Sequence, residues 1–108
     1  MDTENTKAQM RKGILEYCIL AMLSRSSSYA SDIIKELKEA QVIVVEGTLY
    51  PLLTRLKNAG LLSYRWEESL QGPPRKYYEL TETGKAYLID LDKSWDELVA
   101  SVNLIRTR

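Results

Sequence analysis

The last quarter of the chain carries an apolar stripe that constrains how the whole chain can fold. Six apolar residues recur at alternating intervals of three and four positions: Leu88, Leu91, Trp95, Leu98, Val102 and Ile105. This spacing keeps one face of an α-helix apolar, as in the seam of a coiled coil. Thr81 precedes the segment as a suitable N-cap, and Glu82 matches the positive end of the helix dipole. A chain of 108 residues is too small to bury so long a seam, so we predict that a second copy covers it.

Three helices are predicted before this seam. The first spans about 7–23, and its apolar stripe is wide enough for contacts on two sides. The second starts near Ser28, whose hydroxyl can cap it, and we expect its buried face to consist of Ala30, Ile33, Ile34 and Leu37. The third runs from about 47 to 59. Pro51 is tolerated in its first turns, where N–H groups lack helical partners, and Gly60 ends it.

Two further stretches have the residue types of extended backbone. Residues 42–45 are all β-branched, which fits either a short strand or a packed turn between the second and third helices. Residues 62–67 alternate apolar and polar side chains, as a strand does, and residues 76–80 supply the returning strand. We expect the connection at 68–74 to be irregular, because Pro73 and Pro74 cannot donate ladder hydrogen bonds.

The composition argues against several classes of function. The chain has no histidine and one cysteine, which excludes histidine-based acid–base catalysis and a zinc site. We therefore expect no enzyme, no metal and no cofactor. Cys18 lies among apolar residues and is interpreted as a small core residue, which favours a cytoplasmic protein. The uncharged stretch at 17–24 is too short to cross a membrane, and residues 1–6 do not have the pattern of a secretory signal.

A net charge of zero conceals an uneven distribution of charge. Residues 81–98 hold five acids against two lysines, whereas the middle of the chain carries the cations Arg55, Lys57, Arg65, Arg75 and Lys76. We expect a basic side that faces nucleic acid and a more acidic side away from it.

The predicted order of elements is that of a winged helix-turn-helix. The fold class is therefore mainly α with a small β-hairpin, an N-terminal helix and a long C-terminal dimerisation helix. Residues 1–80 form the predicted DNA-binding domain and residues 81–108 the dimerisation helix, within one compact unit. In such folds the second helix of the motif enters the major groove, and the hairpin lies over the backbone or minor groove. The side chains available for DNA on these two elements are Thr48, Tyr50, Thr54, Arg55, Lys57, Arg75 and Lys76.

Two longer motifs resemble the PadR family of transcriptional regulators. They are EGTLYPLLTRLKNAGLL at 46–62 and GPPRKYYELTETG at 72–84. The resemblance extends over essentially the whole chain and implies the shorter branch of the family, in which one helix follows the wing. It also implies DNA contacts at Thr48, Tyr50, Arg55, Arg75 and Lys76. One departure concerns the second helix, where the family usually starts with a Tyr-Gly-Tyr-Glu type of sequence and this chain has Tyr-Ala-Ser-Asp at 29–32. A contact made by an aromatic residue at the position of Ser31 is therefore in question.

The predicted function is sequence-specific binding of double-stranded DNA by a homodimeric transcriptional regulator. The resemblance favours a repressor, and two-fold symmetry implies an inverted-repeat operator. The six seam residues form the expected dimer interface. The alternative is a winged-helix module that binds protein and not DNA. That alternative predicts a third helix and a wing without cations, and both elements carry them here.

Trp95 suggests a further hypothesis, a small aromatic effector. Flat rings stack well on indole, and some PadR-like repressors resemble one another in binding flat aromatic compounds near the dimer interface. Met10, Asp92 and Asp96 are the other residues expected beside such a ligand. The alternative is that Trp95 only packs within the seam.

Overall fold

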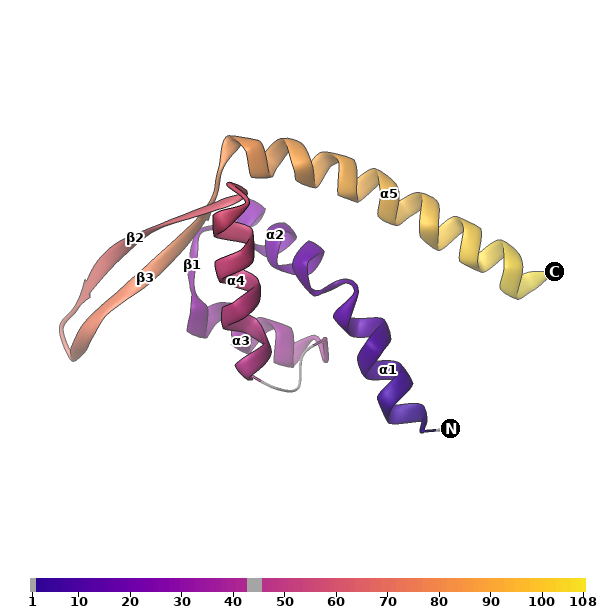
Figure 1. The fold of residues 1–108 in the computed structure, drawn as a ribbon, viewed down its shortest axis with the longest axis horizontal. Helices are drawn as coiled ribbons and strands as arrows, with labels where there is room; N and C mark the ends of the chain where they lie inside the picture. Colours follow the sequence, from indigo (N-terminus) through magenta and orange to yellow (C-terminus); the bar gives the residue numbers. More distant parts are fainter. Residues whose placement is uncertain (1, 43–45) are drawn as a thin grey trace.

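The computed structural model describes residues 2–42 and 46–108. Within these residues the chain folds into five α-helices and a small antiparallel sheet (Figure 1). The helices are α1 (Thr3–Lys12), α2 (Leu15–Arg25), α3 (Ala30–Glu39), α4 (Leu49–Asn58) and α5 (Glu82–Thr107). The strands are β1 (Ser28–Tyr29), β2 (Leu62–Ser69) and β3 (Gly72–Leu80), and the short 3₁₀-helix η1 (Glu46–Thr48) precedes α4. This order confirms the predicted winged helix-turn-helix with a long C-terminal helix.

The wing and α5 leave the helical head in opposite directions (Figure 1). Helices α2, α3 and α4 gather in the head, and the β2–β3 hairpin projects from it as the wing. Helix α1 and the outer part of α5 extend on the other side. The helices within residues 2–42 and 46–108 are each too short or too polar to cross a lipid bilayer.

The predicted first helix is in fact two helices. Helix α1 ends at Lys12 and α2 begins at Leu15, with Gly13 and Ile14 between them. Glycine in a helix interior costs about 1 kcal/mol relative to alanine, and here it interrupts a stripe whose spacing alone indicated continuity. The N–H of Gly13 bonds to the carbonyl of Arg11 and closes α1. The break turns α1 away from the head, and all of its residues stay outside the core.

The second predicted helix, α3, starts at Ala30, two residues after the predicted start at Ser28. Ser28 pairs with Tyr78 in a two-residue strand, β1, and Tyr29 is the N-cap of α3. The carboxylate of Asp32 accepts a hydrogen bond from the Tyr29 amide at 3.3 Å, which satisfies a free N–H at the helix start. The sheet order is β1-β3-β2, all antiparallel, so β1 joins the start of α3 to the base of the wing.

Strand β3 begins at Gly72, so the prediction of an irregular connection through residues 72–74 is wrong. Ser69 pairs with Gly72 and Glu67 pairs with Arg75, with a shift of register between these pairs. Pro73 and Pro74 lie within that shift. They do not need to donate ladder bonds there, and the fixed φ of proline suits extended backbone.

Helices α3 and α4 end in the same way, with one residue in the left-handed region. Gly60 has φ 79°, as predicted, and Leu61 N–H bonds to the carbonyl of Leu56. Gln41 takes the same conformation after α3 with φ 61°, and Val42 N–H bonds to the carbonyl of Leu37. Val42 packs against the core. Residues 43–45, where the sequence predicted a strand or a packed turn, lie outside the described residues.

The core lies between α2, α3, α4 and the base of the wing. Its fully buried side chains are Ile19, Leu20, Ile33, Leu37, Leu49 and Leu53. The predicted apolar faces of α3 and α4 are therefore confirmed, although Leu52 and Ala30 are only partly buried. Thr81 is the N-cap of α5, as predicted, and its hydroxyl accepts a hydrogen bond from Gly84 N–H at 2.9 Å.

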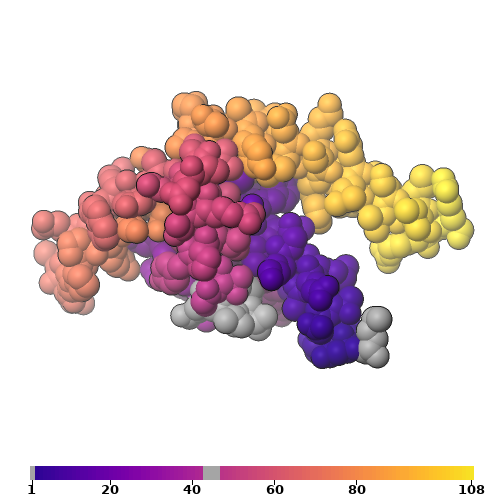
Figure 2. Space-filling view, in the orientation of Figure 1, coloured from indigo at the N-terminus to yellow at the C-terminus, as the bar shows by residue number. Residues whose placement is uncertain are grey.

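The seam of α5 leaves the core after its first two residues, Leu88 and Leu91. Leu88 is 7% exposed and Leu91 packs against the core, whereas Ile105 near the C-terminus is 72% exposed. Trp95, Leu98 and Val102 between them are exposed as well. The space-filling view shows the C-terminal half of α5 extending beyond the head (Figure 2). The outer half of the seam, Leu98, Val102 and Ile105, therefore stays exposed in the described part of one chain.

Candidate nucleic-acid interface

The exposed side chains of α4 point in three directions. Arg55 lies toward α2 and forms an ion pair with Glu16. Lys57 lies toward the wing, with its ammonium 6.0 Å from the centre of the Tyr64 ring. Thr54 is exposed between these two rows. Thr48 ends η1 and is the N-cap residue of α4, without a capping hydrogen bond from its side chain.

Glu16 is a feature of this surface that the sequence did not reveal. Its ion pair holds Arg55 at the edge of α4, while the Arg55 side chain stays largely exposed. Exposed ion pairs contribute only about 0–1 kcal/mol to stability. The pair therefore orients Arg55 more than it stabilises the fold, and it also lowers the positive charge of this edge.

Arg75 does not extend from the wing into solvent. Its guanidinium lies over the Tyr29 ring at 3.9 Å from the ring centre, and its Nη1 donates to Ser31 Oγ at 3.4 Å. Tyr29 in turn contacts Tyr77 edge to face at 4.9 Å. Ser31 therefore accepts a hydrogen bond from the wing at the position where the resemblance implied an aromatic residue.

Lys76 lies on the opposite face of the wing from Arg75, as neighbouring strand residues do. Its ammonium is 4.5 Å from the centre of the Tyr64 ring and 5.5 Å from that of Trp66. Cation–π contacts at exposed sites contribute about 0.5–1 kcal/mol. They direct the Lys76 side chain toward α4 rather than away from the protein.

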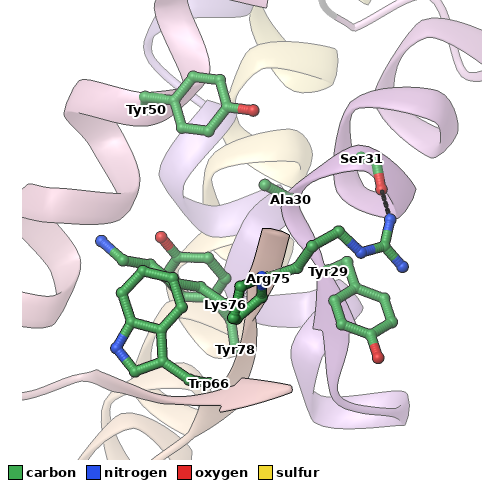
Figure 3. Close-up of a pocket in the computed structure, with 9 residues that line it drawn as sticks. Tyr29, Ala30, Ser31, Tyr50, Trp66, Arg75, Lys76 and Tyr78 are labelled. Atoms are coloured by element: carbon green, nitrogen blue, oxygen red, sulfur yellow. Dashed lines mark hydrogen bonds between the residues drawn. The ribbon is translucent and has the colours of Figure 1, made fainter. Parts of the chain in front are cut away.

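These elements enclose a cleft of about 340 Å³ between the starts of α3 and α4 and the wing (Figure 3). Tyr50 contributes from α4, and Figure 3 shows its ring across the open space from Trp66. The other lining residues are Tyr29, Ala30, Ser31, Pro74, Arg75, Lys76 and Tyr78. Three of the predicted DNA contacts, Tyr50, Arg75 and Lys76, therefore lie around one cleft. Thr54, Lys57 and Lys76 line a smaller hollow beside it, of about 120 Å³.

Comparison with known proteins identifies the family. The sequence model of the transcriptional regulator PadR-like family matches residues 19–90, which include the helix-turn-helix, the wing and the start of α5. The chain belongs to the PadR-like family. Members of this family are transcriptional regulators, which act by binding DNA, and not enzymes.

Solved structures of PadR-like proteins resemble this chain over nearly its whole length. A PadR-like transcription factor from Bacteroides fragilis is 65% identical, with a TM-score of 0.78, over 94% of this chain and 98% of that one. A PadR-like transcriptional regulator from Bacillus cereus is 36% identical, with a TM-score of 0.80, over 93% of this chain and 98% of that one. An uncharacterized protein of Lysinibacillus sphaericus is 29% identical over 91% of this chain and 93% of its own length. The similarity thus reaches beyond the winged helix into α5.

The residues proposed for an effector are only partly brought together in this PadR-like chain. Met10 and Trp95 line an apolar cleft of about 450 Å³ between α1 and α5, with Arg11, Ile14, Leu98, Val99, Val102 and Asn103. Of the described residues, Asp92 and Asp96 are not part of this wall. Asp92 instead accepts a hydrogen bond from the Tyr17 hydroxyl at 2.5 Å. The cleft is therefore more apolar than the sequence predicted.

Tyr17 connects the head to α5. Its ring lies 6.0 Å from that of Trp95, and its hydroxyl bonds to Asp92. This hydrogen bond, with partial burial and the negative charges of Asp92 and Asp96, raises the pKa of Tyr17 to about 12 from an ordinary value of 10.0. The neutral phenol is therefore favoured in the fold relative to the unfolded chain.

Tyr17→Phe is expected to remove a contribution to stability that is present at neutral pH and is lost at high pH. Because folding raises the pKa, the stabilisation is fully present below pH 10.0 and is lost as the pH rises toward about 12. The free energy of unfolding, measured by urea denaturation, should fall more steeply over this range in the wild type than in Tyr17→Phe. Tyr87→Phe, which changes an exposed tyrosine on α5, should behave like the wild type. Parallel curves for wild type and Tyr17→Phe would contradict the assignment.

Proposed function

We propose that this PadR-like regulator recognises a specific sequence in double-stranded DNA through α4 and the wing. The observation that supports this most is the cleft in which Tyr50 of α4 faces Arg75 and Lys76 of the wing. In winged-helix proteins the recognition helix enters the major groove and the wing lies over the adjacent backbone. Thr48, Thr54, Arg55 and Lys57 complete the proposed contact surface.

We further propose that residues 81–108 form a dimerisation helix and that residues 1–80 form the DNA-binding domain. Trp95, Leu98 and Val102 leave an apolar surface on α5 that continues across the cleft to Met10 of α1 and to Ile14, which follows α1. Contiguous apolar surface of this kind marks an interface. A second copy is the occupant that a two-fold symmetric regulator requires.

Such a dimer gives the proposed repressor its mode of action. Its two α4 helices would enter successive major grooves on one face of the DNA, about 34–36 Å apart. The operator is then an inverted repeat, and occupancy of a promoter by the dimer would block transcription.

The wing contacts can be tested by the salt dependence of binding. An operator would first be selected from a pool of random duplexes, and affinity would then be measured by fluorescence anisotropy at several salt concentrations. Lys76→Ala should weaken operator binding and lower the slope of log affinity against log salt by about 1.8, because the dimer loses two phosphate contacts that each contribute about 0.9. Arg75→Ala should do the same, with an added loss because Arg75 also anchors the wing to Tyr29 and Ser31.

Lys85→Ala is the matched control for these variants. Lys85 lies on α5 and pairs with Glu82, outside the proposed contact surface, so its removal should leave the salt slope unchanged. Failure to enrich any sequence, together with equal slopes in all variants, would favour a winged helix that binds protein instead of DNA.

A small aromatic effector is a second proposal, and the apolar cleft beside Trp95 favours it. A flat ring stacked on Trp95 between α1 and α5 would change the angle between the two heads and hence the distance between the two α4 helices. Operator affinity measured with a panel of aromatic compounds tests this directly. Unchanged affinity with every compound would leave Trp95 as a packing residue of the interface.

A further inference from the structure

Trp66 is a large aromatic side chain on the wing that stays 61% exposed. It lies on β2 directly opposite Lys76 of β3, so the two side chains share one face of the hairpin. Tyr64 and Tyr78 are paired on the same face, two residues nearer the head. The wing therefore carries a row of aromatic rings that begins in the core at Tyr78 and ends in solvent at Trp66.

The position of the Trp66 ring is set by its neighbours. Tyr64 contacts it edge to face, with ring centres 5.9 Å apart and an angle of 85° between the planes. The Lys76 ammonium lies 5.5 Å from its centre. Tyr64 itself packs on the buried ring of Tyr78 at 5.7 Å. Trp66 is thus held in place from one side, while its other side remains open.

The open side faces the cleft between the wing and α4 (Figure 3). Tyr50 stands across this cleft and is itself more than half exposed. Arg75 and Lys76 are the charged residues of the wall, and none of the described residues that line the cleft is acidic. Aromatic faces together with cations suit a ligand that alternates negative charge with flat or apolar groups.

We propose that Trp66 is a DNA-contacting residue and that the cleft holds one sugar–phosphate strand of the operator. This rests on the proposed function, because the strand that separates a major groove from the adjacent minor groove must pass between the recognition helix and the wing. Trp66 packs against a deoxyribose from the wing side, and Tyr50 approaches the strand from α4. Lys76 neutralises the adjoining phosphate.

Substitution of Trp66 separates this contact from the phosphate contact of Lys76. Trp66→Ala should weaken operator binding about ten-fold for each half-site, and therefore about hundred-fold for the dimer, with an unchanged salt slope. Lys76→Ala should lower the slope by about 1.8, about 0.9 for each half-site of the dimer. Trp66→Phe keeps a flat ring and should recover most of the affinity. Unfolding curves of the three variants verify that each remains folded.

A spectroscopic measurement places DNA at the ring itself. The chain has two tryptophans, so labelling with 5-fluorotryptophan gives two ¹⁹F resonances, which the Trp66→Phe spectrum assigns. Addition of operator duplex should shift and broaden the Trp66 resonance. In the absence of DNA, that resonance should not depend on protein concentration.

The outcomes distinguish this proposal from the function on which it rests. Suppose that operator binding depends on Lys76, that Trp66→Ala binds as tightly as the wild type, and that operator does not shift the Trp66 resonance of the wild type. The proposed Trp66 contact is then wrong, while the proposed DNA-binding function is kept. If no duplex binds at all, the proposed function fails. A Trp66 resonance that shifts with protein concentration alone would place a second copy of the chain in the cleft and overturn the contact with DNA.

Discussion

Gly84→Ala is expected to destabilise the fold by about 3 kcal/mol, at the upper end of the cost of overpacking a core. A Cβ atom at this position would lie 2.2 Å from the carbonyl oxygen of Leu61 and 2.7 Å from Cδ1 of Leu80. The first of these atoms is backbone, so a change of rotamer cannot relieve the clash. Gly84 lies in the first turn of α5, where the helix crosses the start of β2.

The clash would disturb several contacts at once. The Thr81 hydroxyl donates to the carbonyl of Gly60 at 2.7 Å and accepts from Gly84 N–H, so the N-cap of α5 and the end of α4 meet here. Displacement of α5 would also change its angle to the head. We therefore expect Gly84→Ala to lose operator affinity together with stability.

Urea denaturation provides the test, with Gly72→Ala as the matched control. A Cβ at Gly72 meets nothing within 4 Å, and its φ is not in the left-handed region. That variant should change the free energy of unfolding by no more than about 0.5 kcal/mol. Equal stabilities for the two alanine variants would show that the α5 junction adapts, contrary to the expectation.

Leu98→Glu is expected to convert the proposed dimer into a monomer and to lower operator affinity at least about hundred-fold. Leu98 is exposed in the single chain, so the folded monomer should lose little stability. In a dimer the carboxylate would be buried without a partner, which costs several kcal/mol. A monomer has only one DNA-binding domain, so it loses the gain in affinity from bivalent binding, which is typically about 10²–10⁴-fold.

Analytical ultracentrifugation measures the loss of the dimer, and fluorescence anisotropy measures the loss of operator affinity. Ile89→Glu is the control, because Ile89 is exposed on α5 but is not one of the six seam residues. It should sediment as a dimer and bind the full operator normally. Leu98→Glu should bind an isolated half-site about as well as the wild-type chain does. A Leu98→Glu protein that remains dimeric would move the interface away from the seam.

The direction of the wing cations illustrates where prediction from sequence reaches its limit. Arg75 and Lys76 were both predicted as DNA contacts because they occur together at the return of the wing. Strand alternation sends them to opposite faces, where Arg75 packs on Tyr29 and Lys76 on Tyr64. The bond between Arg75 and Ser31 joins residues far apart in the chain. A pattern within a few neighbouring residues cannot predict a contact between two residues so far apart.

Features that depend on short-range chemistry could be predicted from the amino-acid sequence. Helical spacing identified the buried faces of α3 and α4, Thr81 indicated the start of α5, and Gly60 indicated the end of α4. Each of these features involves residues within a few positions of one another, so their types and intervals suffice to predict it. The family motifs at 46–62 and 72–84 also lie within continuous stretches.

Contacts between residues of different elements could not be predicted in this way, because they depend on how the elements pack. Strand β1, the ion pair of Glu16 with Arg55, and the close approach of Gly84 to Leu61 all join distant parts of the chain. The partners in these contacts are selected by how the helices and the wing pack, and many other pairs of the same residue types would be compatible with the local patterns. The cleft between Tyr50 and Trp66 has the same origin, because it exists only where α4 and the wing are brought side by side.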